Sequence, residues 1–358
     1  MRLFVTGATG YVGSRLVCAL LGAGHDIVAA SRDAGSLRRF GWHDRVTVID
    51  MDADDPVSTR HAFVTAGPVD ALYYLVHGID RPGFGGGDIR AAQNVALAAR
   101  EVGVGRIVYL GGFVPPGPRE QLSPHLRSRA AVADALALPD GPELVWLRAA
   151  VILGAGSTSF EIMRYLADRL AVVPEPGWTG NAMDPISIRD VLHYLVAAAE
   201  SQVPAGAYDI AGPDVGTRYR SVLTEYLRAI GQPRLRIPLP HVSTRLAGEV
   251  AGRIVPVPTA LTANLLTSLT RPMNSSEQSI RAIVDDPDGG LVPMRTAVEL
   301  AVRTPPPRPV CELADVHHLA DTDPAWAGGD LMRLRRRVGS VVGFAARATR
   351  GVVSLLSP

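Results

Sequence analysis

Residues 2–14 are Arg2-Leu3-Phe4-Val5-Thr6-Gly7-Ala8-Thr9-Gly10-Tyr11-Val12-Gly13-Ser14, and this stretch decides the fold. Its apolar residues 3–5 predict a short strand buried inside a parallel sheet, and residues 15–21, after the glycines, predict a helix. A strand, a glycine turn and a helix in this order bring backbone N–H groups and a helix N-terminus onto a pyrophosphate. The spacing is GxxGxxG rather than the GxGxxG of the ordinary dinucleotide fingerprint. The motif therefore indicates dinucleotide binding mainly because a predicted strand precedes it and a predicted helix follows it. The alternative is a glycine-rich connection in another α/β fold.

Each of the three glycines has its own task in this interpretation. A side chain at Gly7 would block the tight turn, one at Gly10 would block the approach of a phosphate, and one at Gly13 would separate helix from strand. We therefore predict that this loop binds a dinucleotide. The predicted binding residues of the loop are Gly7, Ala8, Thr9, Gly10, Tyr11, Val12 and Gly13.

The composition is that of a globular protein. Of the 358 residues, 47% are hydrophobic and 20% are charged, and the net charge of +1 gives no reason to expect nucleic-acid binding. No apolar run reaches the length of a membrane span, and Met1 leads directly into the first strand, which leaves no room for a signal peptide. We therefore expect a cytoplasmic protein.

The cysteine and lysine contents narrow the chemistry. Cys18 and Cys311 lie far apart in the sequence, so we expect neither a disulfide framework nor a metal site, which agrees with a reducing compartment. All 36 basic residues are arginine, which excludes any mechanism that needs an ε-amino group.

Apolar segments alternate with helical ones along the first 156 residues. The segments predicted as strands are residues 3–5, 26–30, 46–49, 70–78, 106–110 and 144–148. Strands that alternate with helices predict the α/β class, with a doubly wound parallel sheet.

Polar residues follow the second, third and fourth predicted strands, at the sheet edge where ligands bind in such folds. Ser31 and Arg32 follow the second strand, and the arginine can pair with a 2′-phosphate, which favours NADP(H) over NAD(H). Asp52 can reach the adenine, and Val76 and His77 end the fourth strand. We predict that all five bind the cofactor. The alternatives are a solvated loop arginine and a hydrogen-bonded loop histidine.

The alternation loosens beyond residue 156. We predict a dinucleotide-binding domain over residues 1–156 and a small substrate-binding lobe over 157–303, with one or more elements that return to the sheet. A proline-rich linker over 304–330 is expected to end the folded body. A basic amphipathic tail over 331–358 is expected to follow it.

The tail carries six arginines and, after Asp330, no acidic residue. On a helical wheel most of these arginines lie opposite an apolar face, which predicts that residues 331–356 form a helix on an anionic membrane surface, at the inner face of the membrane. The alternative is a tail that packs on its own body or on a second subunit. The sequence does not predict an oligomeric state.

Residues 6–13, together with Ser31 and Arg32, resemble extended and atypical short-chain dehydrogenase/reductases, and most closely the NmrA-like NAD(P)H-binding group. The segments 73–77, 147–154 and 185–190 share this resemblance, which covers residues 1–303. It implies that the glycine loop binds the pyrophosphate, that Arg32 binds the 2′-phosphate and that Asp52 lies by the adenine. In some relatives a stretch like residues 323–329 precedes a further domain.

The chain departs from this family at the catalytic residues. Active relatives have a serine after the fifth strand and a Tyr-x-x-x-Lys pair on the next helix, whereas this chain has Gly111-Gly112-Phe113 and the pair His125 and Arg129. Residues four apart share a helix face, so His125 and Arg129 can lie as the tyrosine and lysine do, although their side chains have different chemistry. His125 can serve as a proton donor, since an ordinary imidazole has a pKa of about 6.5, and Arg129 can bind the ribose or a phosphate. The alternative is that both only cap and solvate a helix.

Two functions fit these features. The first is an NADPH-dependent reductase of a small carbonyl, quinone or imine, with His125 or a water molecule delivering the proton. The second is a non-catalytic sensor of NADP(H), which the missing serine, tyrosine and lysine favour. Residues 157–303 can roof a substrate pocket and favour the reductase, which we prefer. NAD(H) is not excluded, and the intact glycine loop argues against a scaffold with a vestigial cofactor site.

Overall fold

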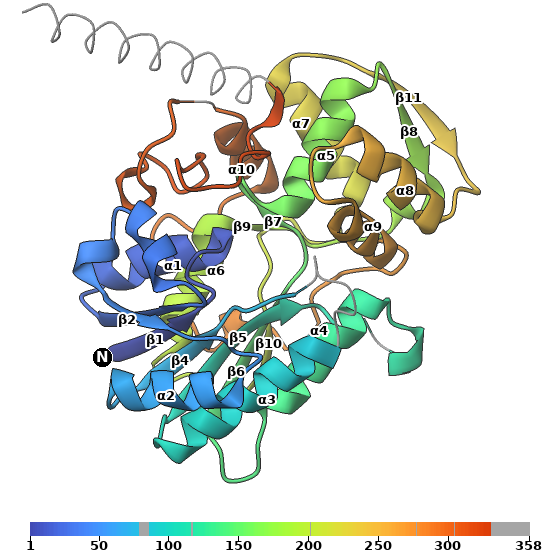
Figure 1. Cartoon of the computed structure of the whole chain (residues 1–358). Coiled ribbons are helices and arrows are strands. Elements are labelled where there is room, and N and C mark those ends of the chain that lie inside the picture. The colour runs from blue at the N-terminus through green and yellow to red at the C-terminus, as the bar shows by residue number, and fades with distance from the viewer. Residues whose placement is uncertain (79–85, 116, 201, 277, 304, 331–358) are drawn as a thin grey trace, which may run out of the picture.

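A computed structural model describes the chain except residues 79–85, 116, 201, 277, 304 and 331–358. At its centre lies a seven-stranded sheet in which every neighbouring pair is parallel (Figure 1). In spatial order the strands are β10 (Gly206–Asp209), β6 (Glu143–Ala149), β5 (Arg106–Gly112), β4 (Ala71–Tyr74), β1 (Arg2–Thr6), β2 (Asp26–Ser31) and β3 (Thr47–Asp50). The predicted doubly wound α/β fold is confirmed, and β10 is a seventh strand beyond the six predicted.

Helices cover both faces of the sheet, as the apolar strands require. One face is covered by α1 (Tyr11–Gly22) and α6 (Ile188–Ala198). The other is covered by α2 (Pro56–Ala66), α3 (Gly86–Glu101) and α4 (Pro124–Leu136). The start of α2 is fixed by Asp55, whose carboxylate accepts the Val57 N–H at 2.9 Å, and the start of α4 by Ser123, whose hydroxyl accepts the Leu126 N–H at 3.2 Å. In both helices a proline occupies the first turn.

A second, smaller lobe lies beyond the carboxyl ends of the strands (Figure 1). Its helices are α5 (Thr158–Arg169), α7 (Tyr219–Ile230), α8 (Thr244–Ile254), α9 (Thr259–Ser268) and α10 (Met294–Val302). Two small parallel sheets join it, one of β8 (Val172–Pro176) and β11 (Leu235–Leu239) and one of β7 (Ile152–Leu153) and β9 (Ile186–Ser187). The chain passes from the lobe back to the sheet through α6 and β10.

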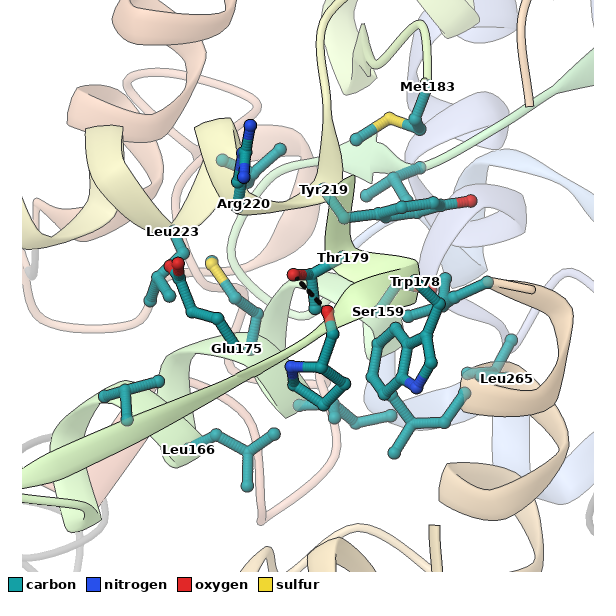
Figure 2. Close-up of a pocket in the computed structure, with 18 of the residues that line it drawn as sticks. Ser159, Leu166, Glu175, Trp178, Thr179, Met183, Tyr219, Arg220, Leu223 and Leu265 are labelled. Atoms are coloured by element: carbon teal, nitrogen blue, oxygen red, sulfur yellow. Dashed lines mark hydrogen bonds between the residues drawn. The ribbon is translucent and has the colours of Figure 1, made fainter. Parts of the chain in front are cut away.

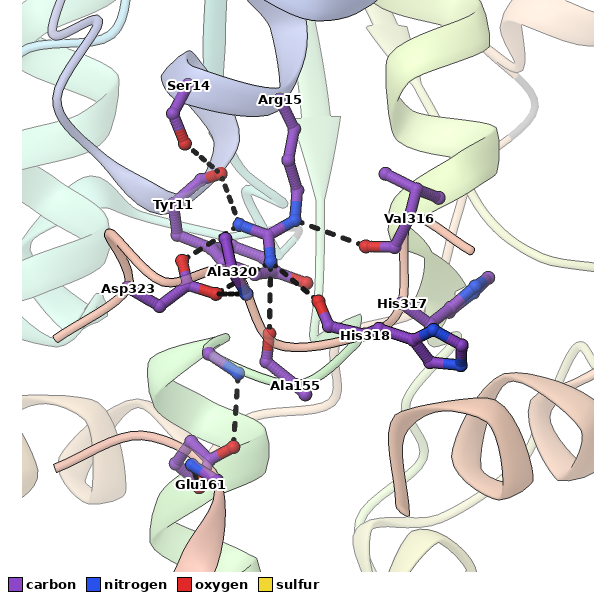
Figure 3. Close-up of polar contacts among 12 residues, drawn as sticks. Tyr11, Ser14, Arg15, Ala155, Glu161, Val316, His317, His318, Ala320 and Asp323 are labelled. Atoms are coloured by element: carbon purple, nitrogen blue, oxygen red, sulfur yellow. Dashed lines mark hydrogen bonds and ion pairs between the residues drawn. The ribbon is translucent and has the colours of Figure 1, made fainter. Parts of the chain in front are cut away.

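Residues 305–330 differ from the predicted linker, because they fold back across α1 and pack against the body; we call them the strap. The guanidinium of Arg15 on α1 binds the carboxylate of Asp323 with two hydrogen bonds of 2.9 and 2.7 Å (Figure 3). The side chains are 0% and 3% exposed. The carbonyls of Val316 and His318 accept two further bonds from Arg15, at 3.1 and 2.9 Å. A buried charge requires such partners, and the strap supplies most of them.

Two further contacts hold the strap. The buried carboxylate of Glu161 on α5 accepts the Gly328 N–H at 3.0 Å and the Gly156 N–H at 3.1 Å, which joins the strap to the lobe. His317 is hydrogen-bonded to the hydroxyl of Ser187 at 2.7 Å and to the carboxylate of Asp315, also at 2.7 Å. This serine is 1% exposed and caps α6, so the serine, histidine and aspartate stabilise the fold rather than face a substrate.

Cys18 on α1 and Cys311 in the strap form a disulfide, with their Cα atoms 5.3 Å apart. The expectation of no disulfide is therefore wrong. The two residues are 293 positions apart, and only the return of the strap across α1 brings them together. The cysteine pattern consequently no longer argues for a reducing compartment.

The described part of the chain contains no helix long and apolar enough to cross a membrane. The basic tail, residues 331–358, lies outside the described residues. Its helix on an anionic membrane surface therefore stays a prediction.

Replacing Asp323 by Asn should destabilise the protein by about 3–5 kcal/mol, because the Arg15 charge would remain buried without a counter-charge. The matched control is Glu101→Gln, which breaks the exposed ion pair with Arg60 (2.7 Å) and should cost about 0–1 kcal/mol. Urea unfolding of both variants measures the difference. Equal losses in the two would contradict a structural role for the buried pair.

Candidate functional site

The carboxyl ends of the central strands open onto a groove of about 310 Å³. Residues from the glycine loop and from the ends of β2, β3 and β4 line it. The predicted cofactor residues among them are Gly7, Thr9, Gly10, Ser31, Arg32, Asp52, Val76 and His77. The structure thus brings together residues that the sequence places on four separate strand ends.

The glycine loop has a shape that side chains would fill. Gly7 has a φ of +68°, and a Cβ there would lie 2.6 Å from the carbonyl oxygen of Leu75 at the end of β4. A Cβ on Gly13 would lie 2.2 Å from the carbonyl oxygen of Gly7, so the first turn of α1 can approach the loop only without a side chain. A Cβ on Gly10 would meet no atom closer than 3.3 Å. A close-packed loop that leaves its helix N-terminus accessible fits a pyrophosphate.

The rest of the predicted loop residues have different positions. Tyr11, Val12 and Gly13 line the neighbouring pocket described below. Ala8 is 0% exposed and packs in the core. A contact of Ala8 with a cofactor would therefore have to come from its backbone.

The end of the groove where we expect the adenosine has one positively and one negatively charged side chain, Arg32 and Asp52. Arg32 is exposed, and within the described residues its guanidinium has no recorded ion pair or hydrogen bond, which leaves it available to an anionic group. Asp52 is held in place, since its backbone N–H donates to the Ser58 hydroxyl at 2.9 Å and its carboxylate accepts the Asp54 N–H at 3.1 Å.

A second pocket, of about 350 Å³, continues from the groove and runs beneath the lobe. The two cavities share Gly7, Gly10, Leu75 and His77, so one continuous cleft results. One wall is formed by the end of β5 and by α4, and the opposite wall by the lobe.

His125 and Arg129 both line this second pocket, as their spacing on α4 predicts. Arg129 also reaches His77, with 2.8 Å between its Nη1 and the Nε2 of the imidazole. Burial, and then the positive charge of Arg129, lower the pKa of His125 to about 3. The expectation that His125 has an ordinary imidazole pKa is therefore wrong. The ring is neutral at pH 7, so it can donate a hydrogen bond, but it is not an imidazolium that could give up a proton to a substrate.

The carboxyl end of β5 has no room for a serine at Gly111. A Cβ on this residue would lie 2.4 Å from the indole Nε1 of Trp146 on the neighbouring strand. The packing of the sheet thus requires a glycine at this position. Other residues supply the hydroxyl groups of the pocket.

Ser159 and Tyr219 line the pocket from the lobe, opposite His125. Burial raises the pKa of the Tyr219 phenol, so this hydroxyl stays protonated at neutral pH. Sequence reasoning missed both residues, because they stand at the starts of α5 and α7 with no motif around them, and only the packing of the lobe over the sheet brings them here.

Residues 7–137 match the family model of NAD(P)H-binding proteins. An uncharacterized protein of Mycobacterium tuberculosis is 28% identical over 239 residues, which cover 66% of this chain and 25% of that protein. The chain thus spans a quarter of the length of this relative. The 2-alkyl-3-oxoalkanoate reductase of Stenotrophomonas maltophilia is 26% identical over 292 residues, which cover 72% of this chain and 84% of the reductase.

The fold is also shared with solved structures. The triphenylmethane reductase of Citrobacter sp., complexed with NADP(H), superposes with a TM-score of 0.63 at 20% identity, over 84% of this chain and 100% of that one. This likeness shows the fold.

The low pKa of His125 can be measured directly. The ring-proton NMR signal of His125, identified by its absence in His125→Asn, should not move between pH 5.5 and 8, because the ring protonates only near pH 3. In the urea-unfolded protein the same signal should titrate with a midpoint of about 6.5. A midpoint near that value in the folded protein would disprove the assignment.

Proposed function

We propose that the chain is an NADPH-dependent reductase of a small carbonyl, quinone or imine, because residues 7–137 match the family model of NAD(P)H-binding proteins and the fold is shared with a reductase complexed with NADP(H). The observation that carries this proposal is the continuous cleft, in which the dinucleotide groove leads into a pocket roofed by the lobe. A sensor needs only the groove, whereas a reductase needs a second, sheltered space for the substrate.

Each part of the cleft has a task in this reaction. The glycine loop binds the pyrophosphate and Arg32 binds the 2′-phosphate, while Arg129 holds the ribose or a phosphate. The nicotinamide supplies a hydride when the cofactor is bound. The lobe shelters the pocket where the substrate lies from bulk solvent.

Reduction of a carbonyl requires a proton as well as a hydride. Since the imidazole of His125 is neutral, we assign it the task of donating a hydrogen bond to the substrate oxygen, and we assign the proton to water. In the active relatives a tyrosine and a lysine share this task, and α4 carries His125 and Arg129 in their place.

Two of the similar proteins are named as reductases, of a 2-alkyl-3-oxoalkanoate and of a triphenylmethane, and the second is complexed with NADP(H). These names support reduction and the nicotinamide cofactor. The competing function is a non-catalytic NADP(H) sensor, which the low pKa of His125 and the crowded position of Gly111 favour.

Replacing Arg32 by Ala should lower the affinity for NADP⁺ by about tenfold to a hundredfold and leave NAD⁺ binding unchanged, because a charge-assisted contact contributes about 1.5–3 kcal/mol. Arg38→Ala is the control, since this exposed arginine lies on the same segment and does not line the groove. Titration calorimetry measures the affinities of the wild type and both variants for NADP⁺ and NAD⁺. Equal affinities of the wild type for NADP⁺ and NAD⁺ would contradict the assignment of Arg32.

Turnover itself is tested by the loss of NADPH absorbance with a panel of aldehydes, quinones and imines. We expect oxidation with at least one class, and His125→Phe should lower kcat by about 10²-fold or more, because a hydrogen-bond donor to the substrate oxygen is lost, while NADPH affinity stays nearly unchanged. Arg129→Ala should instead weaken nucleotide binding first. NADPH binding without oxidation by any member of the panel would favour the sensor.

A further inference from the structure

The lobe contains an apolar pocket of about 150 Å³ between α5, α7, α9 and β8 (Figure 2). Phenylalanine, methionine, leucine, valine and tryptophan side chains form most of its wall, among them Phe160, Met163, Trp178, Leu223 and Leu265. Protein interiors are usually packed without voids of this size. An apolar cavity of about 150 Å³ can hold a molecule the size of benzene.

This apolar pocket adjoins the pocket beside His125. Both cavities are lined by Val151, Ser159, Tyr219, Leu265 and Leu269. The two cavities are therefore separated by no more than these shared side chains.

Polar groups mark the two ends of the apolar pocket. The hydroxyls of Ser159 and Tyr219 stand at the junction with the cleft, and in Figure 2 the Tyr219 hydroxyl points away from Arg220. Arg220 and Glu175 lie at the opposite end, where Glu175 forms an ion pair with Arg236. The space between them offers an ionised group little compensation for its lost hydration.

We propose that this apolar pocket binds the hydrophobic part of the substrate, either an aromatic ring or an alkyl chain of about six carbons, while the reducible group stays at the junction beside Ser159 and Tyr219. This inference rests on the proposed reductase function, because only a reductase would make the bound molecule a substrate. The binding of an apolar group, however, can be measured without turnover, so the two can fail separately.

The test uses straight-chain 2-alkanones from butanone to 2-decanone as probes, with saturating NADP⁺ so that no reduction can occur. Binding is followed by intrinsic tryptophan fluorescence, to which Trp178 in the pocket wall contributes. We expect the affinity to rise by about fourfold with each added methylene, because burial of one CH₂ contributes about 0.8 kcal/mol, and to level off once the pocket is full. The same titrations without NADP⁺ show whether the pocket depends on the nucleotide.

Met163→Trp places a larger side chain in the pocket and should remove the dependence on chain length, while butanone binds as before. The control is Val64→Trp, an exposed position on α2 that should leave the series unchanged. NADP⁺ affinity, measured on each variant, shows that the groove is intact. An affinity that does not change with chain length in the wild type, or an unchanged series in Met163→Trp, would overturn the proposal, whereas a steep series without any NADPH oxidation would overturn only the reductase.

Discussion

The guanidinium of Arg15 is buried in the first helix, and its need for hydrogen-bond acceptors organises much of the protein. A charge without water is tolerated only when its donors are bound and its charge is neutralised. Asp323 and the strap carbonyls do this, so the strap must lie across α1. Arg15 also stacks over the ring of Tyr11, 4.2 Å from its centroid, in the first turn after the glycine loop. The residues that shape the dinucleotide groove and the last described residues of the chain are therefore held by one interaction.

The same neighbourhood explains two glycines outside the fingerprint. A Cβ on Gly154 would lie 2.1 Å from the hydroxyl of Tyr11, and one on Gly156 would lie 3.0 Å from both Tyr11 and Asp323. The segment after β6 thus makes room for the tyrosine ring and for the carboxylate that neutralises Arg15. Sheet, strap and lobe meet at this point, and none of the three can shift without disturbing the other two.

Much of the fold follows from local signals in the sequence. Short apolar runs predict the first six strands of the sheet. The helices α9 and α10 and the course of the strap were not predicted, because proline-rich segments with weak periodicity do not show what they pack against. The disulfide was missed for the same reason: its two cysteines meet only through the strap.

The candidate site divides in a similar way. Residues at strand ends, such as Arg32, Asp52 and His77, can be predicted because the carboxyl ends of parallel strands meet at one edge. Ser159 and Tyr219 could not, since their place depends on how the lobe packs over that edge. The pKa of His125 also depends on three-dimensional surroundings, since burial and a nearby guanidinium set it and the residue type alone does not.

The position of Asp323 in the chain has a consequence for protein synthesis. Arg15 leaves the ribosome 308 residues before its partner, which at about 5–20 residues per second corresponds to about 15–60 s. During that interval α1 exposes a charged side chain and the apolar surface that the strap later covers. The packing of α1 is therefore completed only after Asp323 has left the ribosome.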